Sequence, residues 1–260
     1  MLSIRQFLVT NDDGVNAQGI KVLTNVLSQF GQVTVVAPDR ERSGHGHSIT
    51  TKTPLRAAKL SHNDTVTVYS VDGTPVDCLK WGLETLFADK QPDLVLSGIN
   101  HGANVGQDVF YSGTIGAARE AILYGLPAIA LSAARDADER IHYDWVAEIL
   151  GRYIQPLLEI SLPRQTLLNV NIPGTQPVDV KGIQVVEMDV EAKRFDIIKD
   201  SDSRGSDIYW MKSLFNVEGK AQSQDLQAVK EGFVTVSPVS VGSANVEVLN
   251  NIEKQMEALS

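Results

Sequence analysis

Short apolar runs alternate with longer segments of helical periodicity along the first 175 residues. The runs predict strands over residues 7–9, 33–37, 66–71, 94–97, 128–131 and 167–172. Apolar positions three and four residues apart predict helices between them. The first carries Ile20, Leu23 and Leu27, and the others span residues 75–86, 115–124 and 145–158. Strand, helix and strand within about thirty residues form a βαβ unit, so we expect a parallel sheet with right-handed crossovers.

The pattern changes after Pro173. Strands are predicted over residues 178–190, 208–214 and 233–236, and a helix over residues 244–259. Residues 196–206 are charged and contain Gly and Ser, which is typical of an exposed hairpin arm or loop. The sequence therefore predicts two parts: an α/β core over residues 1–175 and an extension over residues 176–260.

Composition narrows the range of partners and the compartment. The chain has 260 residues and a net charge of −9, from 23 Lys+Arg against 32 Asp+Glu. Binding to a nucleic-acid polymer or an anionic membrane surface needs a basic footprint, so we expect neither partner. The single cysteine, Cys78, excludes an intramolecular disulfide, and no signal peptide or long apolar segment is evident. We therefore expect a cytoplasmic globular protein.

Polar clusters follow the predicted strands. Asn11-Asp12-Asp13-Gly14 comes after the first strand, residues 39–44 follow the second, and Ser97-Gly98-Ile99-Asn100 closes a third. Ligands of open parallel sheets bind outside the carboxyl ends of the strands. We therefore expect these three loops to meet at one edge of the sheet and to form the functional site.

The adjacent carboxylates of Asp12 and Asp13 suggest a metal site. Two anions this close repel each other unless a cation lies between them. With Ser43 and Asn100 converging on the same edge, the ligands are hard oxygens, which suit Mg²⁺, Mn²⁺ or Ca²⁺ better than zinc. The simpler alternative is a turn whose acidic pair faces a helix N-terminus. The predicted convergence of the four residues favours the metal.

A glycine-rich loop and the helix that follows it form a candidate phosphate site. The loop runs over residues 100–106 and contains Asn104, and Ser112, Gly113 and Thr114 open the helix. Free N–H groups and hydroxyls at a helix N-terminus bind anions. Ordinary helix capping is the alternative explanation for Ser-Gly-Thr alone.

The histidines near these loops have no settled role. His45 and His47 lack a third soft ligand nearby in the sequence, so a loop facing substrate, or no function, is favoured over metal binding. His101 lies inside the glycine-rich loop and is a candidate for proton transfer. Glu120 is expected to decorate its helix or to pair internally.

An ordered set of motifs covering nearly the whole chain resembles the SurE family (stationary-phase survival protein E, a 5′-nucleotidase). The motifs are residues 8–15, 36–44, 73–78, 97–100, 104–106 and 111–114, with weaker matches at residues 142–144, 169–173 and 231–235. The resemblance implies a Rossmann-like three-layer α/β sandwich with a mostly parallel central sheet. It also implies a β-rich C-terminal extension that is exchanged between the subunits of a homodimer or homotetramer.

The resemblance implies a metal-dependent phosphatase that hydrolyses nucleoside monophosphates to nucleoside and phosphate. It implies a 5′-nucleotidase, with 3′-monophosphates and short polyphosphate as further candidate substrates, and one divalent ion (Mg, Mn or Ca) per subunit. By position, the metal ligands are Asp12, Asp13, Ser43 and Asn100. The phosphate-binding residues are Asn11, Asn104, Ser112, Gly113 and Thr114.

Asp12 and Asp13 are also the candidate catalytic residues. The nucleophile is either a water activated by the metal or one of the two aspartates, and we favour the water because both carboxylates are committed to the ion. Two other classes of protein were weighed. A receiver-like signalling module needs a phosphate-accepting Asp after its third strand and a Lys after its fifth, and residues 97–100 and 132–134 contain neither. A nucleotide-binding protein without catalysis remains an alternative.

Overall fold

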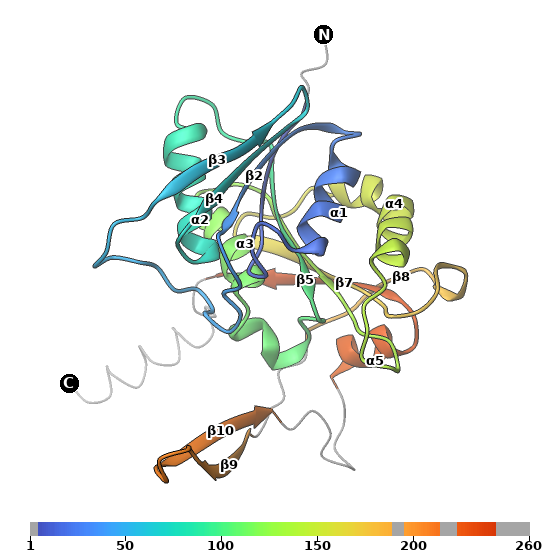
Figure 1. Ribbon diagram of the computed structural model, residues 1–260. Coiled ribbons are helices and arrows are strands. Elements are labelled where there is room, and N and C mark those ends of the chain that lie inside the picture. The colour runs from blue at the N-terminus through green and yellow to red at the C-terminus, as the bar shows by residue number, and fades with distance from the viewer. Residues whose placement is uncertain (1–4, 189–194, 214–222, 243–260) are drawn as a thin grey trace, which may run out of the picture.

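A nine-stranded, mostly parallel sheet forms the centre of the computed structural model, which describes residues 5–188, 195–213 and 223–242 (Figure 1). The strands run in the spatial order β3-β4-β2-β1-β5-β6-β7-β11-β8. Their bounds are β1 (Arg5–Thr10), β2 (Gly31–Pro38), β3 (Ala57–His62), β4 (Val66–Val71), β5 (Leu94–His101), β6 (Ala128–Ala133), β7 (Thr166–Ile172), β8 (Ile183–Val185) and β11 (Val234–Ser240). Among the strand pairs described in this sheet, β3–β4 and β7–β11 are antiparallel and the others are parallel.

Helices cover both faces of this sheet. Helices α1 (Gln18–Leu27) and α4 (Tyr143–Glu159) lie on one face, and α2 (Pro75–Trp81) and α3 (Gly113–Leu123) lie on the other (Figure 1). Successive side chains of a strand point to opposite faces. Accordingly Phe7 and Val9 of β1 pack in the core under α1 and α4, whereas Leu8 packs under α2 and α3. The predicted three-layer α/β fold with a mostly parallel sheet is confirmed.

Most elements of the first 175 residues lie where the pattern predicts them, with a few differences. Strand β5 continues to His101, beyond its predicted end at residue 97, so the polar residues 97–100 belong to the strand and not to a loop after it. Strand β3 was not predicted, because all of its residues are exposed and its sequence has no apolar periodicity. The helix predicted over residues 75–86 is regular only to Trp81 and continues as a π-helical turn, η1 (Gly82–Leu86).

The C-terminal part differs more from the prediction. Instead of one strand over residues 178–190, the structure has a 3₁₀ turn, η3 (Pro177–Asp179), and the three-residue strand β8. Helix α5 (Gln224–Lys230) was not predicted. Because β8 and β11 belong to the central sheet, that sheet crosses the predicted boundary at residue 175. The helix predicted over residues 244–259 lies outside the described residues.

A separate antiparallel hairpin projects from the body of the molecule, as Figure 1 shows. It consists of β9 (Phe195–Ser201) and β10 (Asp207–Ser213). The segment predicted as an exposed hairpin arm or loop is therefore the first strand and turn of this hairpin. No helix within the described ranges is long and apolar enough to cross a membrane.

Candidate active site

The loops after β1 and β2 meet the last residues of β5 at the carboxyl edge of the sheet, and the polar cluster predicted to follow that strand, residues 97–100, lies within it. Thr10 at the end of β1 pairs with Ser97 of β5. The backbone N–H of Arg42, in the loop after β2, donates to the carbonyl oxygen of Asp12 (2.7 Å), and the N–H of His101 donates to Asp13 Oδ2 (3.0 Å). The structure thus brings the three polar clusters into direct contact.

Asp12 is buried against the N-terminal end of α3. Thr114 Oγ1 donates a hydrogen bond of 2.5 Å to Asp12 Oδ1, and the backbone N–H groups of Gly113 and Thr114 also donate to this carboxylate. Burial raises the pKa of Asp12, and the hydrogen bonds from Thr114 and Gly113 offset only part of that rise. The positive end of a helix is a favourable place for a carboxylate, so α3 fixes Asp12 at the centre of the site.

Asp13 lies beside Asp12 and is half-buried. Burial and then the negative charge of Asp12 raise the pKa of Asp13 to about 6, against the hydrogen bond from His101. The mutual repulsion of the two carboxylates is the physical condition that a divalent cation relieves.

Asn100 presents an oxygen at the same edge. Its Nδ2 donates to the carbonyl oxygen of Gly102 (2.8 Å), which leaves Oδ1 as the amide atom available to a ligand. Ser43 is exposed, and its Oγ donates to Glu41 Oε1 (2.9 Å). Ser43 lies next to Arg42 on the loop that contacts Asp12, but in this conformation its hydroxyl is engaged by Glu41.

The donor set fits a hard cation. Among the described residues, no three His, Cys, Asp or Glu side chains are grouped so as to hold a metal ion. A cation at this edge would therefore be held by the carboxylates of Asp12 and Asp13 together with hydroxyl and amide oxygens. This is the ligand chemistry of Mg²⁺, Mn²⁺ and Ca²⁺.

The predicted phosphate-binding residues divide into two groups. Ser112 caps α3, accepting from Ile115 N (3.2 Å) through Oγ, and its hydroxyl hydrogen remains available to a ligand. Gly113 is required by space, because a Cβ there would lie 2.9 Å from Asp12 Cβ. Asn11, in contrast, is fully buried, and its Nδ2 donates to the carbonyl oxygen of Gly14. Asn11 therefore braces the loop that carries Asp12 and Asp13.

The histidines occupy different environments. His47 Nε2 lies 2.7 Å from Glu120 Oε2, and Lys80 Nζ donates to Glu120 Oε1 at 2.8 Å. His47 and Lys80 thus both contact the buried carboxylate of Glu120, so Glu120 pairs internally, as the alternative for this residue had it, and does not merely decorate its helix. His45 is exposed, and its Nδ1 lies 3.1 Å from the carbonyl oxygen of Ser43.

Tyr143 is a site residue that the sequence-based reasoning missed. Its hydroxyl lies 3.2 Å from His101 Nδ1. Burial and the negative charge of Asp13 raise the pKa of Tyr143 to about 12, so the phenol stays protonated. No sequence spacing connects Tyr143 with His101 or Asp13. The start of α4 comes close to them only in the folded structure.

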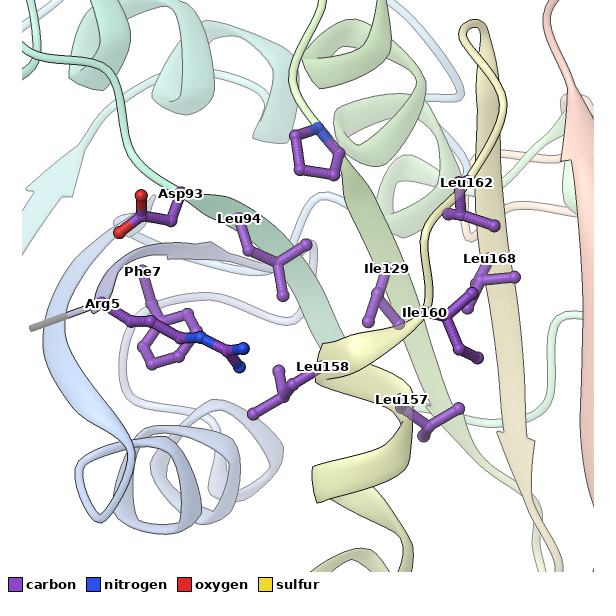
Figure 2. A pocket seen from close by; sticks show the side chains of 11 residues that line it. Arg5, Phe7, Asp93, Leu94, Ile129, Leu157, Leu158, Ile160, Leu162 and Leu168 are labelled. Carbon is purple, nitrogen blue, oxygen red and sulfur yellow. The ribbon is translucent and has the colours of Figure 1, made fainter. Parts of the chain in front are cut away.

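An apolar cavity of about 160 Å³ lies at the other edge of the sheet, where the strands begin (Figure 2). It is lined by residues such as Phe7 of β1, Leu94 of β5 and Leu168 of β7, with Arg5 and Asp93 as its charged residues. The paired carboxylates of Asp12 and Asp13 and the N-terminal end of α3 are at the opposite, carboxyl edge. That edge is therefore the candidate active site.

The whole chain is similar to known proteins. The family model described as "Survival protein SurE" matches residues 7–194. The 5′-nucleotidase SurE of Carboxydothermus hydrogenoformans is 43% identical over 258 residues, which cover 98% of this chain and 97% of the relative. The 5′-nucleotidase SurE of Histophilus somni strain 2336 is 44% identical over 232 residues, covering 89% and 91%. The crystal structure of the SurE protein from Aquifex aeolicus superposes with a TM-score of 0.82 at 36% identity and covers 96% of this chain and 99% of that one. The chain therefore belongs to the SurE family.

Proposed function

We propose that this protein is a metal-dependent 5′-nucleotidase that hydrolyses nucleoside monophosphates to nucleoside and phosphate. The observation that carries the proposal is the pair Asp12 and Asp13 at the carboxyl edge of the sheet, with the N-terminus of α3 directed at Asp12. The similarity to relatives named 5′-nucleotidase SurE supports the reaction and the substrate class.

The metal would be held by Asp12, Asp13 and Asn100, with Ser43 from the neighbouring loop. When bound, a divalent ion there would polarise the phosphoryl group, lower the pKa of a coordinated water and partly neutralise the transferring group. We propose one ion per subunit. The repulsion that raises the pKa of Asp13 supports this assignment, because a cation would remove it.

The protein's own donors bind and orient the phosphate. The Ser112 hydroxyl, the second hydrogen of Asn104 Nδ2 and the end of α3 supply donors beside the carboxylates. These groups are fixed before substrate arrives, so they stabilise charge that spreads over the phosphoryl oxygens without reorganising. His101 and Tyr143 lie beside Asp13 and are therefore candidates to contact the nucleoside.

Phosphate release tests this proposal against a nucleotide-binding protein without catalysis. The substrates are nucleoside 5′-monophosphates, the 3′-monophosphates and a short polyphosphate, each with Mg²⁺, Mn²⁺ or Ca²⁺ and each with EDTA. We expect release from 5′-monophosphates that EDTA abolishes. Binding of the nucleotide without release under any of the three metals would overturn the enzyme assignment.

We further propose that the hairpin β9–β10 mediates homo-oligomer formation, as a dimer or a tetramer. Large apolar side chains are exposed on it, and Ile197, Tyr209, Trp210 and Met211 are each at least 60% exposed. An apolar surface of this kind typically marks a protein interface. Light scattering of the full chain and of a variant with the hairpin shortened would test this proposal, which an unchanged mass would refute.

A cytoplasmic location is also proposed. It is supported by the single cysteine of the chain, Cys78, which is buried and free of any disulfide.

A further inference from the structure

The turn between β5 and the 3₁₀ helix η2 (Gly106–Phe110) is held by an unusual set of buried polar side chains. Its central residue, Asn104, is only 5% exposed. Asn104 N donates to Asn171 Oδ1 (2.8 Å), and its carbonyl oxygen accepts from Asn169 Nδ2 (2.8 Å) and from Asn171 Nδ2 (3.2 Å). Its side-chain Nδ2 donates to Ser132 Oγ (2.8 Å). Four hydrogen bonds thus fix both the backbone and the side chain of Asn104.

A buried carboxylate holds the same turn two residues further on. Asp225, at the start of α5, is fully buried, and its Oδ2 accepts from the backbone N–H of Gly106 (2.7 Å). Its other oxygen accepts from Leu226 N (2.9 Å). The hydrogen bond that holds Gly106 thus comes from the C-terminal part of the chain, 119 residues away.

The packing of the sheet interior does not require the amide side chains of Asn169 and Asn171. Asn169 and Asn171 are both fully buried, and as alternate residues of β7 they point to the same face. Burying an amide costs free energy unless it is hydrogen-bonded, and Asn169 Oδ1 has no hydrogen-bond partner. A β-branched residue would pack at either position without that cost. Both amides instead donate to the carbonyl oxygen of Asn104, so their buried polar groups serve to hold this turn.

We propose that Asn171, Asn169 and Asp225 are positioning residues for phosphate binding, acting through Asn104 and Gly106. The proposal rests on the proposed function, in which Asn104 donates to the phosphate. An amide nitrogen carries two hydrogens, and with one directed at Ser132 the other is held in a single direction. Fixing the turn removes the entropic cost of ordering this donor when the anion binds.

The C-terminal part of the chain is therefore a component of the active site. Asp225 and β11 follow the hairpin in sequence, and they return to the central sheet and to the turn. Loss of the Asp225 contact acts on phosphate affinity even though Asp225 lies outside the metal-binding edge.

The test compares the affinity for inorganic phosphate with the affinity for Mn²⁺ in the full-length protein. Asn171→Leu removes both of its hydrogen bonds to Asn104, and Asn171→Asp keeps the acceptor but loses the donor. Asp225→Ala removes the acceptor for Gly106, and Asp225→Asn restores a neutral one. Phosphate is measured by calorimetry and by competitive inhibition, and Mn²⁺ by electron paramagnetic resonance. The matched control is Thr235→Val, since Thr235 pairs with Asn171, is fully buried and has no partner for its Oγ1.

Asn171→Leu and Asp225→Ala each remove bonds that fix the turn. We therefore expect each substitution to weaken phosphate binding at least about tenfold and to leave the Mn²⁺ affinity unchanged. Asn171→Asp and Asp225→Asn should recover part of the loss, and Thr235→Val should match the wild type. Equal phosphate affinity in all variants, or parallel losses of phosphate and Mn²⁺ affinity, would overturn the proposal. If Asn171→Leu does not fold, Asn171→Asp and the Asp225 pair decide by the same criteria.

Failure of the proposed function has a different signature. A wild-type protein that binds phosphate but releases none from nucleotides refutes the nucleotidase. The selective loss of phosphate binding in Asn171→Leu would still support the positioning role in that case.

Discussion

Thr114 Oγ1 donates a 2.5 Å hydrogen bond to Asp12 Oδ1 across 102 residues of sequence. Both side chains are buried, with Thr114 fully inaccessible and Asp12 3% exposed. The bond ties the N-terminus of α3 to the loop after β1. A residue expected to bind phosphate therefore also orients the central carboxylate of the site.

Replacing Thr114 by valine should lower kcat/KM by about ten- to a hundredfold. Valine keeps the shape but removes the donor, and leaving a buried acceptor without its partner costs about 1–3 kcal/mol. Steady-state phosphate release measures the change. Thr114→Ser, which keeps the hydroxyl, is the control and should retain most of the activity; equal losses in both variants would contradict the role of this bond.

Replacing Asp12 by asparagine should cut turnover at least about a hundredfold, the scale of one lost electrostatic stabiliser. Stability should change little, because burial already disfavours the charged form of Asp12 and raises its pKa. Phosphate release and thermal unfolding are measured together. Asp93→Asn is the control, since Asp93 accepts from Gln6 N at the opposite edge of the sheet. Unchanged turnover in Asp12→Asn would refute the metal and catalytic assignments.

The arrangement of the first 175 residues follows from local pattern. The alternation of Phe7, Leu8 and Val9 between two cores shows why a short apolar run before Asn11 was sufficient to predict a central strand. Once the sheet is parallel, the convergence of the loops after β1 and β2 with the carboxyl end of β5 follows from topology alone. That is why Asp12, Asp13 and Asn100 could be grouped before the structure was known.

Contacts between residues that only the fold brings together could not be predicted from the sequence. Aspartate is usually found at the surface, yet Asp225 is fully buried, and its carboxylate accepts a hydrogen bond from the backbone N–H of Gly106. Asn11 has the residue type of a phosphate ligand, but its side chain is buried and its Nδ2 donates to the carbonyl oxygen of Gly14. The local periodicity of the sequence does not show that these polar side chains are buried, nor which distant residues they contact.

Replacing Gly113 by alanine should lower both activity and stability. The added Cβ would lie 2.9 Å from Asp12 Cβ and 3.0 Å from Asp12 Oδ2, so Asp12 or α3 must shift. We expect a loss of about 1–3 kcal/mol in the free energy of unfolding, the scale of overpacking in a core. Urea unfolding and phosphate release measure the two effects.

The matched control is Gly151→Ala within α4, where an added Cβ meets nothing within 4 Å. Alanine there should stabilise the protein by about 0.5–1 kcal/mol, because glycine in a helix interior costs that amount relative to alanine. Destabilisation by both substitutions would show that the close approach of Gly113 to Asp12 is not the cause.

The Glu120 cluster should make stability depend on pH in the acid range. Burial acts to raise the pKa of Glu120, but the hydrogen bonds from Lys80 and His47 outweigh it and lower the pKa below its ordinary value of 4.5. A lowered folded-state pKa means that the unfolded chain takes up the proton first as pH falls. The stabilisation is therefore fully present above pH 4.5 and is lost as pH falls through the lowered pKa of the folded state.

Glu120→Gln should remove this part of the pH dependence. The variant should be less stable than the wild type at pH 7, and the difference should shrink as the pH falls below 4.5, because the wild type then loses the charge that the variant never had. Urea unfolding across this range measures the difference. Glu148→Gln is the control, since Glu148 is exposed on α4 and forms an ion pair with Arg152. Because an exposed pair contributes little, its curve should follow that of the wild type. A constant gap between Glu120→Gln and the wild type down to the lowest pH would mean that packing, and not the charge on Glu120, carries the stabilisation.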